Sequence, residues 1–202
     1  MREFTNDWFQ QTAEANFELN LLPRKATFRT AIEIGAYEGQ ATCWMLDHMG
    51  FEMIHCIDTW KGGAEHKDVD MKRVFERFRA NVNYEQSEIV EVDCCTSTQA
   101  LSDLVADQKK WERPGMSIGY SFIYVDGSHL AKDVLTDAVL AWQILEPGGY
   151  LAFDDYTWTE KPRQEANPLD NPRLAIDAFY TIFRREAVIL PSTQHQFWLM
   201  KV

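Results

Sequence analysis

The sequence predicts an α/β protein: a Rossmann-like three-layer α-β-α sandwich around a mostly parallel, seven-stranded sheet that ends in an antiparallel hairpin. Three observations support this prediction. Short apolar runs alternate with helix-periodic stretches along most of the chain. The first such run leads into a loop bounded by Gly35 and Gly39, after which a helical pattern begins. The last two apolar runs, 187–190 and 197–202, are separated only by a turn, so one of them must run antiparallel.

The composition limits the kinds of protein this chain can be. Its 202 residues are 46% hydrophobic and 25% charged, so we expect one domain over 1–202. A net charge of −11 argues against nucleic acid as a partner. No run approaches the roughly 18 apolar residues of a membrane span, so we expect no membrane partner. The four cysteines lack Cys-x-x-Cys spacing and are interpreted as reduced thiols of a cytoplasmic protein.

The first predicted elements lead up to the glycine loop. Apolar residues recur at helical spacing over 6–22, and Pro23 should end this N-terminal helix (1–22 with its lead-in). We expect that helix to lie over the sheet edge or the mouth of a site. The run 31–34 is apolar and largely β-branched, as in a buried strand, and a helix over 39–49 follows.

The same alternation continues to the closing hairpin. The proline-rich stretch 156–171 is too long for a simple connection and is predicted to be a lid. The other predicted elements are strands at 52–57, 88–92, 121–125 and 150–153, helices at 69–82, 98–106, 130–145 and 173–184, a polar loop at 59–68 and a linker at 108–119.

Acidic residues follow four of the five predicted parallel strands. They are Asp58, Asp93, Asp126 and the pair Asp154 and Asp155. The carboxyl ends of parallel strands share one edge of the sheet, which is where ligands bind in open α/β folds. Clustered carboxylates repel one another unless a cation or hydroxyl groups satisfy them. The sequence therefore predicts a ligand site at this edge.

The glycine loop distinguishes between cofactors. A pyrophosphate-binding loop needs Gly-x-Gly-x-x-Gly, but the second glycine is missing here, and Glu38 would repel phosphate. The loop thus disfavours a nicotinamide enzyme and tolerates a cationic sulfonium better. A plain tight turn is the alternative.

Residues 30–42 resemble the first motif of class I S-adenosylmethionine-dependent methyltransferases. More narrowly, residues 31–156 are similar to the metal-dependent small-molecule O-methyltransferases. Glu-Ile-Gly-Ala-Tyr-Glu-Gly is similar to the catechol type, whereas Tyr-Val-Asp-Gly-Ser-His and Pro-Gly-Gly-Tyr-Leu-Ala-Phe-Asp-Asp-Tyr are closer to the macrocin type. The resemblance implies S-adenosyl-L-methionine contacts at Glu33, Gly35, Ala36, Tyr37, Gly39, Asp58, Thr59, Trp60, Asp93, Cys94 and Asp126.

Some of these contacts have specific expected roles. Asp58 should accept both ribose hydroxyls, the alternative being a loop cap. Trp60 either stacks on adenine or belongs to the core. Asp93 and Cys94 either contact the adenine edge or form a turn.

The resemblance also implies metal ligands at Asp126, Asp154 and Asp155. Three carboxylates make an all-oxygen site, which suits Mg²⁺, Mn²⁺ or Ca²⁺. Alternatively, Asp126 binds cofactor or caps a helix, and the other two shape a turn. The catechol pattern has a lysine base three residues after the first metal aspartate, and this chain has His129 there. We interpret His129 as the base, unless it only begins the next helix, and His66 as a second base or substrate contact.

Together these features predict divalent-metal-assisted O-methylation of a small hydroxylated molecule, a sugar or a phenol. Tyr156 and Trp158 in the lid suit either acceptor. A metal-independent methyltransferase acting on oxygen, nitrogen or carbon is one alternative. A cofactor-binding module without turnover is another. The sequence leaves the acceptor and a homo-oligomeric state open.

Overall fold

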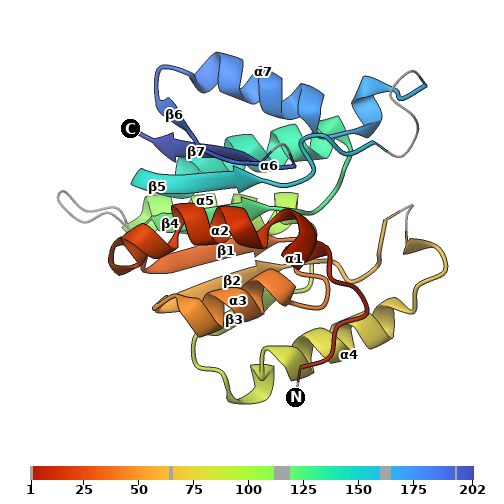
Figure 1. Ribbon diagram of the computed structural model, residues 1–202. Coiled ribbons are helices and arrows are strands. Elements are labelled where there is room, and N and C mark those ends of the chain that lie inside the picture. The colour runs from red at the N-terminus through yellow and green to blue at the C-terminus, as the bar shows by residue number, and fades with distance from the viewer. Residues whose placement is uncertain (1, 64–65, 112–118, 160–164, 194) are drawn as a thin grey trace.

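The computed structural model describes residues 2–63, 66–111, 119–159, 165–193 and 195–202. Its seven strands form one sheet in the order β3-β2-β1-β4-β5-β7-β6 (Figure 1). Strands β1 to β5 are parallel, whereas β7 is antiparallel to both β5 and β6. The predicted fold class is therefore confirmed. The strands are β1 Thr30–Ile34, β2 Met53–Ile57, β3 Val90–Asp93, β4 Tyr120–Val125, β5 Leu145–Phe153, β6 Ala187–Leu190 and β7 Phe197–Lys201.

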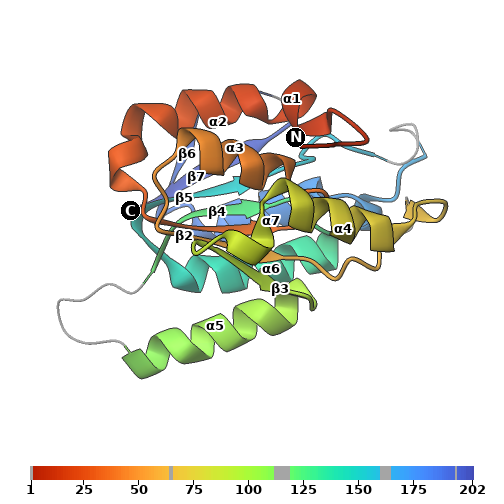
Figure 2. The ribbon, with the colours of Figure 1, turned by 90° about the horizontal axis from the view of Figure 1, so that it is seen from below.

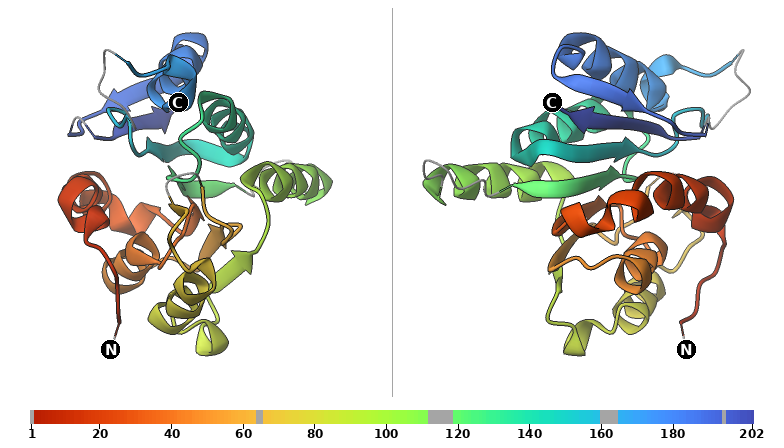
Figure 3. Two further views of the ribbon diagram at one scale, coloured as in Figure 1. Left: turned by 90° about the vertical axis from the view of Figure 1, so that its right-hand side faces the viewer. Right: turned by 60° about the vertical axis from the view of Figure 1, so that its left-hand side comes forward.

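Helices cover both faces of the sheet (Figures 2 and 3). Helices α1 Trp8–Thr12, α2 Glu14–Asn20, α3 Gln40–His48 and α4 Met71–Asn81 contribute to the core on one face. Helices α5 Ser97–Trp111, α6 Ala131–Ile144 and α7 Arg173–Phe183 contribute to the core on the other. Short 3₁₀ segments lie at η1 Leu22–Thr27, η3 Tyr84–Gln86 and η4 Pro168–Asp170. Within the described ranges, no helix is both long and apolar enough to cross a membrane.

The prediction of one continuous N-terminal helix over 6–22 is wrong. It is divided at Ala13 into α1 and α2, and helical structure continues in η1 past Pro23. Proline has no N–H but is tolerated in the first turn of a helix, where that donor would have no intrahelical partner. Pro23 occupies such a position in η1, so it begins a turn there.

Three further boundaries differ from the predictions. Strand β5 begins directly after α6, at Leu145 and not at 150, and a register shift against β4 between Tyr120 and Phe122 accommodates its proline and glycines. Helix α5 extends to Trp111 into the predicted linker, whose residues 112–118 lie outside the described ranges, as do 64–65 of the polar loop and 160–164 of the predicted lid. Asp93 is the last residue of β3, not the first after it.

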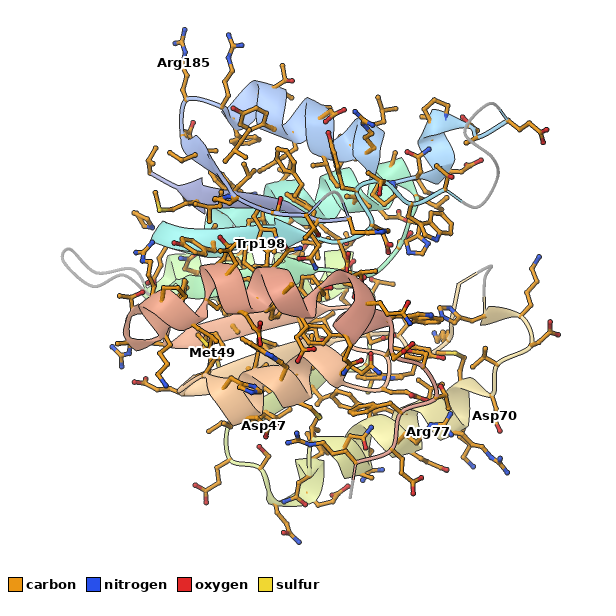
Figure 4. The ribbon with its side chains drawn as sticks, viewed as in Figure 1. Asp47, Met49, Asp70, Arg77, Arg185 and Trp198 are labelled. Atoms are coloured by element: carbon orange, nitrogen blue, oxygen red, sulfur yellow. The ribbon has the colours of Figure 1, made fainter. Side chains whose placement is uncertain are left out.

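The two parts of the predicted N-terminal helix pack in different places. Trp8 of α1 lies against Tyr37 of the glycine loop, with ring centroids 5.7 Å apart, whereas α2 packs on the face of the sheet. Phe17 is fully buried, and its ring meets Trp44, Tyr124 and Trp198 edge-on at centroid distances of 5.4, 5.0 and 5.5 Å. These partners come from α3, β4 and β7, and Trp198 lies next to α2, just above it in Figure 4. One phenylalanine therefore joins the N-terminal helix to both halves of the sheet.

Replacing Phe17 by alanine should lower the free energy of unfolding by about 3–5 kcal/mol, because it removes a fully buried ring. Urea denaturation measures this change. Leu19→Ala on the same helix is the control: Leu19 is 53% exposed, and its loss should cost about 0.5 kcal/mol or less. Equal losses for the two variants would contradict the packing role of Phe17.

Candidate active site

The glycine loop is packed against the end of β4. Gly35 has φ +89°, and a Cβ atom there would lie 2.0 Å from the carbonyl oxygen of Asp126. Its N–H donates to the carbonyl of Ile57 at 2.8 Å. Gly39 has φ +80° and forms the N-cap of α3. Only glycine satisfies both the left-handed backbone and the close approach at position 35.

Asp58 ties the glycine loop to the loop after β2. Its Oδ2 accepts from the N–H of Tyr37 at 2.9 Å, and its Oδ1 accepts from the N–H of Trp60 at 2.7 Å. Burial raises the pKa of the Asp58 carboxyl, while the backbone N–H groups, including that of Thr59, lower it. Each carboxylate oxygen can still accept one further hydroxyl, as two ribose hydroxyls would require. Ala36 is buried within the same loop.

The structure favours the core alternative for Trp60. Its ring lies 4.5 Å from Phe75 and 4.9 Å from Phe78, and its Nε1 donates to the carbonyl of Tyr37 at 2.9 Å. The Tyr37 ring instead stacks on His66, with centroids 5.3 Å apart. His66 thus lies beside the glycine loop.

The expectation that Glu38 would repel a phosphate is wrong, because its carboxylate faces protein groups. It is 1% exposed, its Oε1 lies 2.5 Å from Nε of Arg77, and Thr5 donates to it through both N–H and hydroxyl. Arg77 reaches it from α4 (Figure 4). Because its charge is buried and paired, Glu38 does not itself face a ligand. The missing second glycine, at Tyr37, is the part of the argument that stands.

Two other predicted cofactor residues have protein partners. Glu33 is 2% exposed and accepts from the Thr42 hydroxyl, and burial raises its pKa to about 8. Oδ2 of Asp93 lies within hydrogen-bonding distance of Nε2 of His55, at 2.9 Å. The Cys94 side chain is exposed. Partial desolvation, and then the charge of Asp58, raise the pKa of its thiol.

A small pocket next to the Gly35 loop brings together the remaining predicted residues. The loops after β2 and β5 leave the same side of the sheet in Figure 1. Burial, and then repulsion from Asp154 and Asp155, raise the pKa of Asp126 well above its ordinary value. The lining residues are Val125, Asp126, Gly127, Ser128, His129, Val134, Asp154, Asp155 and Pro172.

His129 is held by one of the pocket carboxylates. Its Nε2 lies 2.8 Å from Oδ2 of Asp155, and its ring centroid is 4.0 Å from that of Trp158. Asp155 has φ +57°, a conformation that is uncommon for a residue other than glycine. A carboxylate bonded to one ring nitrogen orients the imidazole and stabilises the charge gained on protonation.

The three predicted metal ligands line one pocket, but their carboxylates are not arranged around a common point. In the described parts of the chain, no three or more His, Cys, Asp or Glu side chains are arranged to hold a metal ion. Asp154 accepts from Tyr124 through Oδ2 and from the Asp155 N–H through Oδ1, and Asp155 is engaged with His129. The carboxylates of Asp126, Asp154 and Asp155 share one pocket, and their oxygens suit a hard cation. They fit such a cation in donor type and location, and they would have to turn to meet at one point.

Sequence reasoning missed two residues that contact the site from the core. Tyr124 donates to Asp154, and Gln196 donates to the Tyr124 hydroxyl at 3.4 Å. A tyrosine inside the very apolar run 120–125 was the only sign of the first. Nothing local indicated the second.

Comparison with known proteins identifies the family. A family model described as a methyltransferase domain matches residues 32–156, more than half of the chain. The chain belongs to this methyltransferase family. No curated protein sequence matches it. The predicted class I S-adenosylmethionine-dependent methyltransferase is thus confirmed at the level of family and fold.

Solved methyltransferases share the fold at low sequence identity. An O-methyltransferase from Bacillus cereus in complex with SAH is 17% identical with a TM-score of 0.58, covering 94% of this chain and 82% of its own. TomG from Streptomyces achromogenes, in complex with SAM, is 16% identical with a TM-score of 0.61, covering 94% and 80%. MycE from the mycinamycin biosynthetic pathway, in complex with Mg, SAH and mycinamycin VI, is 14% identical with a TM-score of 0.62, covering 98% and 50%.

Replacing Gly35 by alanine should cost about 3 kcal/mol or more of unfolding free energy, because the new Cβ would overlap the Asp126 carbonyl and strain the backbone. Thermal and urea denaturation measure the loss. Gly50→Ala is the matched control, because a Cβ there meets nothing within 4 Å, and it should change stability by about 0.5 kcal/mol or less. A stable Gly35→Ala protein would disprove the close approach.

Proposed function

We propose that this methyltransferase transfers a methyl group from S-adenosyl-L-methionine to a hydroxyl oxygen of a small molecule, a sugar or a phenol, with help from a divalent cation. The observation that supports this proposal is the pocket that contains His129 and three carboxylates directly beside the Gly35 loop. A donor site and an acceptor site must adjoin for a methyl group to pass between them in line. MycE, whose structure contains Mg, SAH and mycinamycin VI, has the same fold.

The proposed cofactor site lies along the edge from Gly35 to Cys94. Asp58 would accept the two ribose hydroxyls, since each of its oxygens already holds one backbone N–H in place. The glycine loop from Gly35 to Gly39 would lie against the amino-acid part of the cofactor. Asp93 and Cys94 stay candidates for the adenine edge.

The proposed reaction has one chemical step. The acceptor oxygen attacks the methyl carbon, the O–C bond forms as the C–S bond breaks, and S-adenosylhomocysteine leaves. His129, oriented by Asp155, would take the hydroxyl proton. Asp126, Asp154 and Asp155 would hold Mg²⁺, Mn²⁺ or Ca²⁺, which when bound would lower the pKa of the acceptor hydroxyl.

One alternative has an observation in its favour. Because the described carboxylates do not converge, the same fold could methylate its acceptor without a metal, with Asp154 and Asp155 contacting the substrate directly. Turnover in the presence of a chelator separates the two proposals. Full activity in EDTA would favour the metal-independent enzyme, and loss restored by Mg²⁺ the metal-assisted one.

We also infer a cytoplasmic location and a single domain over 1–202. All four cysteines are free thiols, as a reducing compartment would keep them. The proposed partner is a small hydroxylated molecule rather than nucleic acid or a membrane. The proposal includes both a monomer and a homo-oligomer.

Asp58→Asn should weaken S-adenosylhomocysteine binding about tenfold to a hundredfold, because it removes the charge from a hydrogen-bonded acceptor. Isothermal calorimetry measures this change. Asp103→Asn on α5, an exposed residue of the same type, is the control and should leave the affinity unchanged. Wild-type affinity in Asp58→Asn would exclude the ribose contact.

His129→Gln should slow the chemical step about a hundredfold at neutral pH, because it removes the proposed general base. Single-turnover transfer of a labelled methyl group to a panel of catechols and hydroxylated sugars measures the rate. His48→Gln, an exposed histidine on α3, is the control. An unchanged rate in His129→Gln would refute the base assignment.

A further inference from the structure

A chain of buried hydrogen bonds runs from helix α2 to the acidic pocket. Asn16 Nδ2 donates to Gln196 Oε1 at 2.9 Å, and Gln196 Nε2 donates to the Tyr124 hydroxyl at 3.4 Å. The Tyr124 hydroxyl then donates to Oδ2 of Asp154. Asn16, Gln196 and Tyr124 are each 1% exposed and Asp154 is 8% exposed. Unpaired polar groups are costly at such depth, so these residues need one another.

The direction of this chain is set by N–H groups that can only donate. The indole Nε1 of Trp198 donates to Gln196 Oε1 at 2.8 Å, which identifies that atom as the amide oxygen. The backbone N–H of Thr193 donates to Asn16 Oδ1 at 2.8 Å, which fixes the second amide in the same way. Neither amide can be reversed without placing two donors or two acceptors face to face.

The fixed direction determines what Asp154 receives. Gln196 presents an N–H to Tyr124, so the single hydroxyl proton of Tyr124 is left for the carboxylate. The second oxygen of Asp154 accepts the backbone N–H of Asp155 at 2.8 Å. Hydrogen bonds in a series that all point one way strengthen one another. Both carboxylate oxygens of Asp154 are therefore held in place, one by the Tyr124 hydroxyl and the other by the Asp155 N–H.

The sheet has room for this chain because a small residue separates two large ones. Tyr124 on β4, Ala152 on β5 and Trp198 on β7 are paired in one row across the strands. The methyl group of Ala152 leaves the space above β5 open to the side chains on either side. The row lies under Phe17, so the chain is sealed from water by aromatic rings.

We propose that Gln196 and Tyr124 are positioning residues, which hold the Asp154 carboxylate in one orientation at the pocket. This inference rests on the proposed function, because Asp154 is a proposed cation ligand there. Residues behind a metal ligand orient it, and their loss commonly weakens metal binding about tenfold to a hundredfold. Through the hydrogen bond from Asn16 to Gln196, helix α2 also helps to hold Asp154 in its orientation.

Gln196→Met and Tyr124→Phe test the proposal, because each keeps the shape of the side chain and removes a link. Crystal structures of both variants should show the Asp154 carboxylate turned from its wild-type orientation. With S-adenosylhomocysteine present, calorimetric Mn²⁺ affinity should fall about tenfold. Affinity for S-adenosylhomocysteine should stay within about twofold, because the hydrogen bonds of these two side chains lead to Asp154. General destabilisation would lower both affinities together.

Thr193→Val is the matched control. It removes the Thr193 hydroxyl that Asn16 Nδ2 contacts at 2.9 Å, keeps the backbone N–H and leaves the path to Asp154 intact. It should lower the melting temperature without changing Mn²⁺ affinity or the orientation of Asp154. If Gln196→Met does not fold, Tyr124→Phe, which keeps its ring, makes the same comparison.

An unchanged Asp154 in both variant structures would overturn the proposal. If the wild-type protein binds no Mn²⁺, the proposed metal site fails, and the orientation of Asp154 in the variants still decides the positioning role. The two failures are therefore distinguishable.

Discussion

The contact between Gly35 and the end of β4 is the constraint on which the site depends. Because position 35 has no side chain, the loop can turn at φ +89° with its Cα against the Asp126 carbonyl. The cofactor is proposed to lie at the end of the sheet that contains Asp58 and the glycine loop. The contact at Gly35 places this region beside Asp126 and Asp154. A methyl group can pass only between sites in contact, so this backbone approach precedes any chemistry.

The N-terminal region supports both sides of that edge. Thr5 donates twice to Glu38 in the glycine loop, and Asn16 begins the chain of hydrogen bonds that ends at Asp154. Between them, Phe17 anchors α2 to the middle of the sheet. These residues precede the matched methyltransferase region at 32–156, and they reach its two functional halves separately. The family's fold is thus completed here by contacts from outside the matched segment.

Electrostatics distinguish the pocket from an ordinary turn. Burial raises the pKa of Asp126 and brings that of Asp154 to about 6, and repulsion between neighbouring carboxylates adds to both effects. A cation or hydroxyl donors would relieve that repulsion, so this arrangement of carboxylates favours a ligand. Glu38, by contrast, is 1% exposed and already paired with Arg77, so its charge has a partner within the protein.

The order of strands and helices, the glycine at 35 and the acids at the strand ends were all predictable from the sequence, because periodicity and turn chemistry are local. Side-chain partners were not. Trp60 packs in the core, Glu38 of the glycine loop pairs with Arg77 on α4, and Gln196 donates to Tyr124, 72 positions away in the sequence. Such pairs depend on which faces the folded sheet brings together. The sequence determined where the polar groups stand along the chain, and only tertiary packing decided which of them face a ligand and which face one another.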